Sequence, residues 1–127
     1  MDLLSLIPKD KSDIETAKRL HYYSYEELKP IIPDLLEWIQ DLNWPVAQVI
    51  APFLVSITNE ITNDIINILR GNDDVWKYWC ITVFAFEENK IDDRLITEIE
   101  RIAKYPSGGE IKEEVQQIAL EALQRLK

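Results

Sequence analysis

The chain has 127 residues and a formal net charge of −9, and a chain of this length is expected to form one domain, residues 1–127. The acidic balance argues against binding to nucleic acid or to anionic membrane surfaces, because both draw affinity from lysine and arginine side chains. No apolar stretch is long enough to cross a bilayer and the first residues do not resemble a signal peptide, so we expect a cytoplasmic protein.

Two short helices are predicted near the N-terminus. Ser12 begins a capping box with Glu15, and Ser24 begins a second one with Glu27. In a capping box the serine hydroxyl accepts the backbone amide of the third helical residue, whose carboxylate accepts the amide of the serine in return. The spacing therefore predicts a helix directly after each serine.

A hairpin of two helices follows in the sequence. Pro30 disfavours helical backbone in the residue before it, so we expect a break near Lys29 and a new helix after it. The second helix of the hairpin is predicted over residues 44–57, with Asn43 as its N-cap and Pro45 in its first turn.

Two more helix pairs are predicted after this hairpin. One pairs a helix over residues 60–70 with an apolar helix that is capped by Asn72 or Asp73 and extends to Phe86. After a polar turn at residues 87–90, the last pair starts at Asp92 and ends with a helix over residues 110–126. The glycine-rich segment between these two helices, residues 105–109, is expected to be a flexible loop.

The second helices of the hairpins align with one another. The stretch that begins at Asn43 matches the one that begins at Asn72, about 29 residues later, and a looser copy begins at Glu110. A period near 30 residues with paired helices is typical of α-solenoids, in which neighbouring helix pairs stack to bury their apolar faces. The sequence therefore predicts an α-solenoid, with a compact irregular helical bundle as the alternative.

Three segments resemble a known family. The segments LIPKDKSD, LLEWIQDLNWPVA and DDVWKYWCI (residues 6–13, 35–47 and 73–81) together resemble a family of small bacterial proteins catalogued as domain of unknown function 5071, which is similar to HEAT and armadillo repeats. The resemblance covers essentially the whole chain and implies no activity. It implies an all-α fold, an α/α superhelix of about three HEAT/armadillo-like helical hairpins with an N-terminal helix.

Residues for catalysis are sparse. His21 is the only histidine and Cys80 the only cysteine, and neither has the flanking residues of a known catalytic motif. Acidic pairs such as Asp73–Asp74 and Asp92–Asp93 stand where helices begin, and a carboxylate there stabilises the helix dipole. We therefore expect a protein that is not an enzyme and that has no cofactor and no metal site.

The aromatic residues give the most informative pattern. Trp44 and Trp76 are predicted to begin their helices near the same edge of the stack, and aromatic side chains anchor interfaces because they bury a large area with little loss of entropy. The candidate protein-binding edge consists of Trp44, Asp73, Asp74, Trp76, Lys77 and Tyr78. The alternative is that these tryptophans close the ends of the hairpins as packing residues.

We expect a scaffold that binds a protein, and the negative charge is compatible with a basic one. The partner is unidentified, and the chain is expected to be a monomer or a weak dimer. A narrower hypothesis is an immunity-like or antitoxin-like protein that covers a basic toxin. A competing hypothesis is a small-ligand-binding protein or enzyme that uses clustered carboxylates, which would need a pocket with converging polar groups and a perturbed carboxylate. A self-associating module is a third hypothesis.

Overall fold

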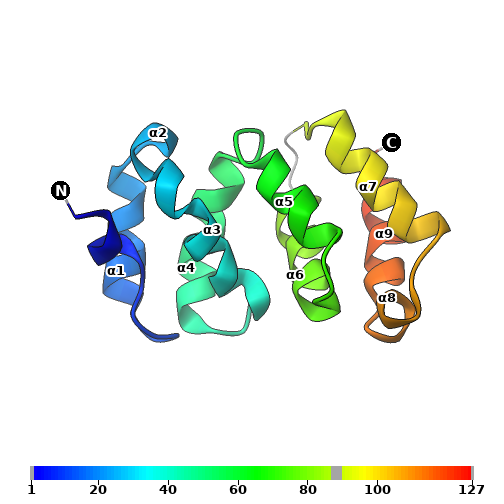
Figure 1. Cartoon of the computed structure of the whole chain (residues 1–127), viewed down its shortest axis with the longest axis horizontal. Coiled ribbons are helices and arrows are strands. Elements are labelled where there is room, and N and C mark those ends of the chain that lie inside the picture. The colour runs from blue at the N-terminus through cyan, green and yellow to red at the C-terminus, as the bar shows by residue number, and fades with distance from the viewer. Residues whose placement is uncertain (1, 87–89, 127) are drawn as a thin grey trace. The chain divides into compact units, whose positions relative to one another are not determined.

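The computed structural model describes residues 2–86 and 90–126, and the regular elements in these ranges are all helices. The predicted all-α class is therefore confirmed. The chain divides into two compact units, unit 1 with residues 1–60 and unit 2 with residues 61–127, coloured from blue to green and from green to red in Figure 1. The assignment of residues 1–127 to a single domain stays a prediction.

Unit 1 is built from short helical segments around an aliphatic core. Its longest helix, α4, contacts α1 and also the segment just before it, η4. The α-helices are α1 (Ile14–Arg19), α2 (Tyr25–Leu28), α3 (Ile32–Leu36) and α4 (Pro45–Ser56), and the 3₁₀ segments are η1 (Leu3–Leu6), η2 (Leu20–Tyr22), η3 (Lys29–Ile31) and η4 (Glu37–Gln40). The fully buried core side chains include Leu20, Leu28, Leu35, Leu36, Ile39, Ile50 and Leu54.

The capping box predicted at Ser24 and the helix break predicted before Pro30 are both confirmed. The amide of Glu27 donates to Ser24 Oγ over 3.3 Å, and the amide of Ser24 donates to Glu27 Oε1 over 3.0 Å. The helix α2 then ends at Leu28, and the 3₁₀ segment η3, which contains Pro30, separates α2 from α3. A local cap and a proline therefore set both ends of α2.

The predicted cap at Ser12 is wrong by one residue. Asp13 caps α1, and its carboxylate accepts hydrogen bonds from the amides of Thr16 at 3.3 Å and Lys9 at 2.9 Å. The bond from the Lys9 amide is the main reason that the pKa of Asp13 lies below its usual range. A carboxylate that accepts two amides fixes both the helix start and the segment before it, which a serine hydroxyl in a simple capping box does not do.

The predicted cap at Asn43 is also wrong. The N-cap of α4 is Trp44, which has no capping side chain, and the amide of Asn43 donates instead to Asp41 Oδ1 over 2.9 Å. The free amide of Val46 in the first turn donates to the carbonyl oxygen of Lys11 over 3.0 Å. An acceptor from a distant part of the chain therefore replaces the local cap that the sequence pattern indicated.

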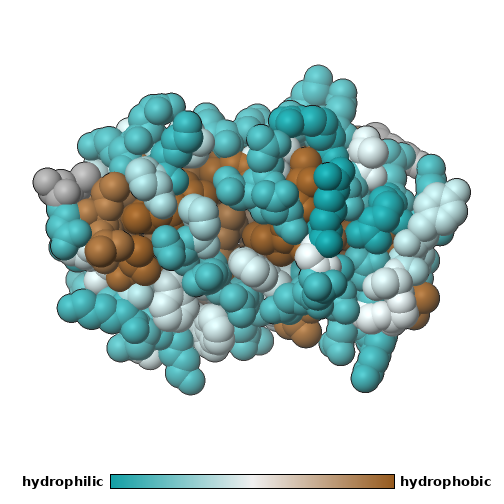
Figure 2. Space-filling view, viewed as in Figure 1, coloured by the Kyte–Doolittle hydropathy of each residue, from teal (hydrophilic) through white to brown (hydrophobic). Residues whose placement is uncertain are grey.

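The hydrophobic N-terminal residues of unit 1 divide between core and surface. Leu6 in η1 is 2 % exposed, whereas Leu4 is 71 % exposed. Figure 2 shows apolar surface on the N-terminal side of this view. The segment therefore docks through part of its apolar residues and leaves the others in contact with solvent.

Unit 2 is built from longer helices that contact one another in pairs. The helix α9 packs against both α6 and α7, and α5 packs against the same two helices (Figure 1). The bounds are α5 (Thr62–Leu69), α6 (Asp74–Phe84), α7 (Asp93–Lys104), α8 (Gly108–Lys112) and α9 (Val115–Leu126). Most of the turn predicted at residues 87–90 lies outside the described residues.

The predicted helix starts at Asp73 and Asp92 are confirmed. Asp73 Oδ1 accepts the amide of Trp76 over 3.1 Å, and Asp92 Oδ1 accepts the amide of Arg94 over 2.8 Å. Hydrogen bonds from the Arg94 side chain and amide lower the pKa of Asp92. These acidic residues cap helices, as the sequence indicated.

The helix predicted over residues 110–126 is interrupted, and the loop predicted over residues 105–109 ends at Ser107, because Gly108 and Gly109 are helical. Ser107 caps α8, with its hydroxyl accepting the amide of Glu110 over 3.2 Å while Glu110 Oε1 accepts the amide of Ser107 over 2.8 Å. Gly108 and Gly109 therefore form the first turn of α8. The chain then breaks at Glu114, which has a φ of 64°, before α9 begins.

Replacing Glu114 by glycine is expected to stabilise the protein by about 1 kcal/mol, because a left-handed conformation costs an L-residue roughly that much and glycine very little. Chemical denaturation of the Glu114→Gly variant measures the change. A Glu114→Ala variant keeps the strain and serves as the control. A glycine variant no more stable than the alanine variant would contradict the expected result.

No helix in the described part of the chain combines the length and the apolar character that a bilayer crossing requires.

Candidate functional site

The structure distributes the six residues of the predicted binding edge over the two units. Trp44 belongs to unit 1, and the other five belong to the first turns of α6 in unit 2 or to its cap. Asp73 is exposed, Asp74, Trp76 and Tyr78 are half-buried, and Lys77 is buried. Whether these residues bind a protein stays a prediction.

Lys77 points into unit 2 rather than toward solvent. Its side chain is 5 % exposed, and its ammonium group lies 2.9 Å from Asp74 Oδ1 and 2.9 Å from Glu110 Oε2. Two carboxylates compensate for the loss of hydration that burial of a cation costs. Lys77 therefore acts inside unit 2, where its ammonium group links α6 to Glu110 of α8.

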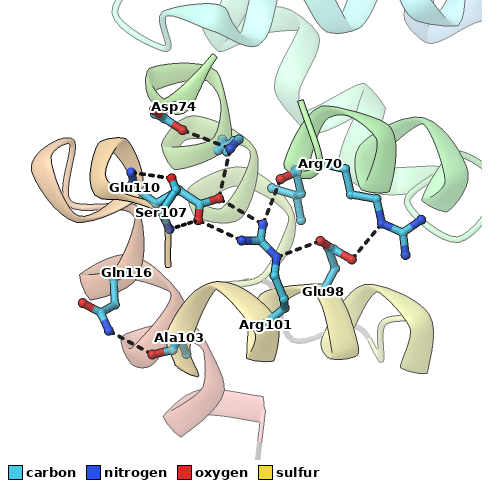
Figure 3. A network of polar contacts seen from close by, with 10 residues as sticks. Arg70, Asp74, Glu98, Arg101, Ala103, Ser107, Glu110 and Gln116 are labelled. Carbon is cyan, nitrogen blue, oxygen red and sulfur yellow. Dashed lines mark hydrogen bonds and ion pairs between the residues drawn. The ribbon is translucent and has the colours of Figure 1, made fainter. Parts of the chain in front are cut away.

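The pairs around Lys77 continue into a network of charged side chains (Figure 3). Arg101 donates to both oxygens of Glu110 over 2.8 and 2.9 Å, and to Glu98 over 3.1 Å. Arg70 donates to the other oxygen of Glu98 over 3.0 Å. Each charged side chain of the network pairs with a side chain of opposite charge. The ion pairs connect, in order, Arg70, Glu98, Arg101, Glu110, Lys77 and Asp74. The positive and negative charges of this network therefore balance.

Glu110 stands at the centre of the network. Its side chain is 1 % exposed, and burial by itself would raise its pKa. Hydrogen bonds from the Arg101 guanidinium, the Ser107 amide and the Lys77 ammonium outweigh burial and lower the pKa of Glu110 to about 2. Glu110 is therefore an anion throughout the physiological pH range.

An open depression of about 420 Å³ lies over the network, lined by Arg70, Lys77, Glu98, Arg101, Ser107 and Glu110. It has the converging polar groups and the perturbed carboxylate that a small-ligand or catalytic site would need. However, a carboxylate with a pKa near 2 is a weak base at neutral pH, whereas general acids and bases work best when their pKa lies near the working pH. Since its charged groups are already paired, this arrangement is suited to holding helices together.

The two adjacent glycines of α8 give a matched pair of substitutions. A Cβ atom at Gly109 would collide with the carboxylate of Asp74, whereas a Cβ atom at Gly108 meets nothing within 4 Å. We expect Gly109→Ala to destabilise the protein by about 1–3 kcal/mol, because Asp74 must move away from Lys77. Gly108→Ala is expected to be neutral or to stabilise it by up to about 1 kcal/mol.

Thermal and chemical denaturation of the two alanine variants measures this difference. Equal stabilities would mean that Asp74 moves aside without loss, and would show that its pair with Lys77 contributes nothing.

A second depression lies in unit 1, beside two tryptophans. Trp38 lies in η4 and Trp44 caps α4, and the turn between them is closed by a hydrogen bond from the amide of Trp44 to the carbonyl oxygen of Asp41 over 3.1 Å. The two rings meet edge to face, with centroids 5.7 Å apart and planes at 74°. The short turn thus brings two large aromatic side chains together at the surface.

Acidic side chains stand beside this tryptophan pair. The depression measures about 250 Å³ and is lined by Ile7, Asp34, Glu37, Trp38, Gln40 and Trp44. Asp34 and Glu37 are exposed, and no hydrogen bond or ion pair of their carboxylates occurs within residues 2–86 and 90–126. We call this site the Trp38–Trp44 depression.

Sequence reasoning placed Trp44 at a binding edge but did not assign Asp34, Glu37 and Trp38 to the same site. The signal was present in the spacing of Asp34, Glu37 and Trp38, because residues three and four positions apart share one face of a helix. The closed turn that brings Trp44 beside Trp38 has no comparable signature in the sequence.

Comparisons with known proteins give a family but no function. The family described as Domain of unknown function (DUF5071) matches residues 6–123 of the chain. A search of curated proteins found no match.

Proposed function

The chain belongs to the DUF5071 family, whose description names no activity, and we propose that it is a non-catalytic protein-binding module of the cytoplasm. The finer fold class, an α/α superhelix of HEAT/armadillo-like hairpins, is part of the same proposal. Its support is the offset of 29 residues between the start of α4 at Pro45 and the start of α6 at Asp74.

The observation that supports binding most directly is the Trp38–Trp44 depression. Tryptophan is enriched among the residues that dominate binding energy, because it buries a large apolar area with few rotatable bonds. Both rings line a concave surface, next to the two carboxylates without partners among the described residues. A partner that covers this surface would bury aromatic area and gain charge pairs at once.

The charge of the site indicates the kind of partner. Asp34 and Glu37 add local negative charge to a chain with a net charge of −9. Complementary charge steers encounter and disfavours partners of the same sign. The proposed partner is therefore a protein with a basic surface, and nucleic acids and anionic membranes are disfavoured.

A pull-down from the native lysate with a matched pair of variants tests the proposal. Asp34→Lys with Glu37→Lys reverses the charge at the depression, and Glu113→Lys with Glu121→Lys reverses two exposed carboxylates of unit 2. Each double reversal adds four positive charges, so both variants have a net charge of −5 instead of −9.

The expected result is a protein that is enriched by the parent and by the unit 2 variant and lost from the variant at the depression. A partner that binds all three forms equally, or a parent that enriches nothing beyond an unrelated acidic protein, would refute binding at the Trp38–Trp44 depression.

A further inference from the structure

We infer that the Trp38–Trp44 depression receives one arginine side chain from the partner, an inference that rests on the proposed function. Its guanidinium group would lie against the indole rings and donate hydrogen bonds to the carboxylates of Asp34 and Glu37. This inference names the chemical group that the site recognises.

The size of the depression favours a single side chain. Pockets that enclose drug-sized ligands or cofactors generally measure about 300–1,000 Å³, and this depression measures about 250 Å³ and is open to solvent. A metabolite with several polar groups would therefore remain largely exposed, whereas one long side chain would be well covered.

The tryptophan pair favours a cation. In an edge-to-face pair each indole ring keeps at least one face that the other ring does not cover. Both Trp38 and Trp44 are half-buried residues that line the depression. The face of an indole ring attracts a cation more strongly than that of any other aromatic side chain. The lining residues among those described include no lysine or arginine that could already occupy this position.

The acidic pair favours a guanidinium over an ammonium group. Asp34 lies in α3 and Glu37 one turn later in η4, so both carboxylates belong to one side of the same helical segment. A guanidinium group is planar, stacks on aromatic rings and presents several N–H donors in a fixed plane, whereas an ammonium group offers a compact and strongly hydrated charge. Only the guanidinium can stack on an indole and donate in its own plane to a carboxylate.

The test is a titration of the ¹⁵N-labelled full chain with three capped tripeptides, in which glycine flanks arginine, lysine or citrulline. The chain contains four tryptophans, and Trp38→Phe and Trp44→Phe variants identify their indole N–H signals. We expect the signals of Trp38 and Trp44 to shift saturably with the arginine peptide, to respond about fivefold more weakly to lysine, and not to respond to uncharged citrulline.

A matched pair of neutral variants checks the role of the carboxylates. Asp34→Asn with Glu37→Gln is expected to weaken arginine binding about tenfold, because both charged acceptors are lost. Glu113→Gln with Glu121→Gln changes the net charge from −9 to −7 in the same way and is expected to leave binding unchanged.

Three results would overturn the inference: equal affinity for lysine, equal affinity for citrulline, or shifts of all four indole signals that no variant changes. The pull-down separates this failure from failure of the proposed function. If charge reversal at Asp34 and Glu37 still abolishes partner binding, the binding role stands and only the arginine assignment falls.

Discussion

Replacing Glu110 by alanine is expected to lower the free energy of unfolding by about 3 kcal/mol. The substitution removes the central carboxylate of the network and leaves Lys77, which is 5 % exposed, with one acidic partner instead of two. Removing one member of a buried ion pair generally costs about 3–5 kcal/mol, because the other charge remains buried without compensation. We expect the lower end of this range, since Asp74 still pairs with Lys77 and Glu98 still pairs with Arg101.

Equilibrium denaturation of Glu110→Ala gives the measurement, and Glu113→Ala is the matched control. Glu113 follows the same helix and is exposed, so its substitution is expected to change stability by less than about 0.5 kcal/mol. Similar stabilities for the two variants would show that the buried network does not stabilise the fold.

The second expected result is a loss of about 3 kcal/mol of stability as the pH falls from about 5 to about 2. The pKa of Glu110 is about 2 in the folded protein against an ordinary value of 4.5, so the unfolded chain binds a proton at a higher pH than the folded chain does. The stabilisation is complete above pH 4.5 and is lost as the pH falls toward the folded pKa. A difference of about 2.5 pKa units corresponds to roughly 3 kcal/mol.

Denaturation of the parent and of a Glu110→Gln variant at a series of pH values isolates this contribution. The variant keeps the other acidic groups, including Asp13 and Asp92, whose pKa values are also lowered. We expect its curve to fall less steeply than that of the parent over this range. Parallel curves would assign the acid sensitivity to groups other than Glu110.

Local signals in the sequence predicted a large part of the fold. The capping box of Ser24, the break before Pro30 and the caps at Asp73 and Asp92 all depend on residues within four positions of one another. Such interactions are fixed by side-chain type and spacing, so a single sequence shows them. The all-α class followed from the same signals.

The features that were missed depend on contacts between distant residues. The carbonyl of Lys11 replaces the expected cap at Asn43, and Glu110 reaches Lys77 across 33 positions of the chain. Lys77 looked like a surface residue, because nothing near it in the sequence indicates the carboxylate that allows its burial. The pairing of Trp38 with Trp44 was missed in the same way, since the two rings meet only after the turn has closed.

Glu110 also couples the local unfolding of α8 to that of the longer helices of unit 2. A helix of five residues such as α8 (Gly108–Lys112) would ordinarily fray, because so short a helix is marginal by itself. Here its middle residue is tied to Lys77 in α6 and to Arg101 in α7, so α8 cannot separate without exposing the partners that hold the longer helices. The hydrogen-bonded amides of Glu110 and Ile111 should therefore exchange with solvent deuterium nearly as slowly as those in the middle of α6 and α7, whereas the amides of Gly108 and Gly109, which begin the helix, should exchange faster.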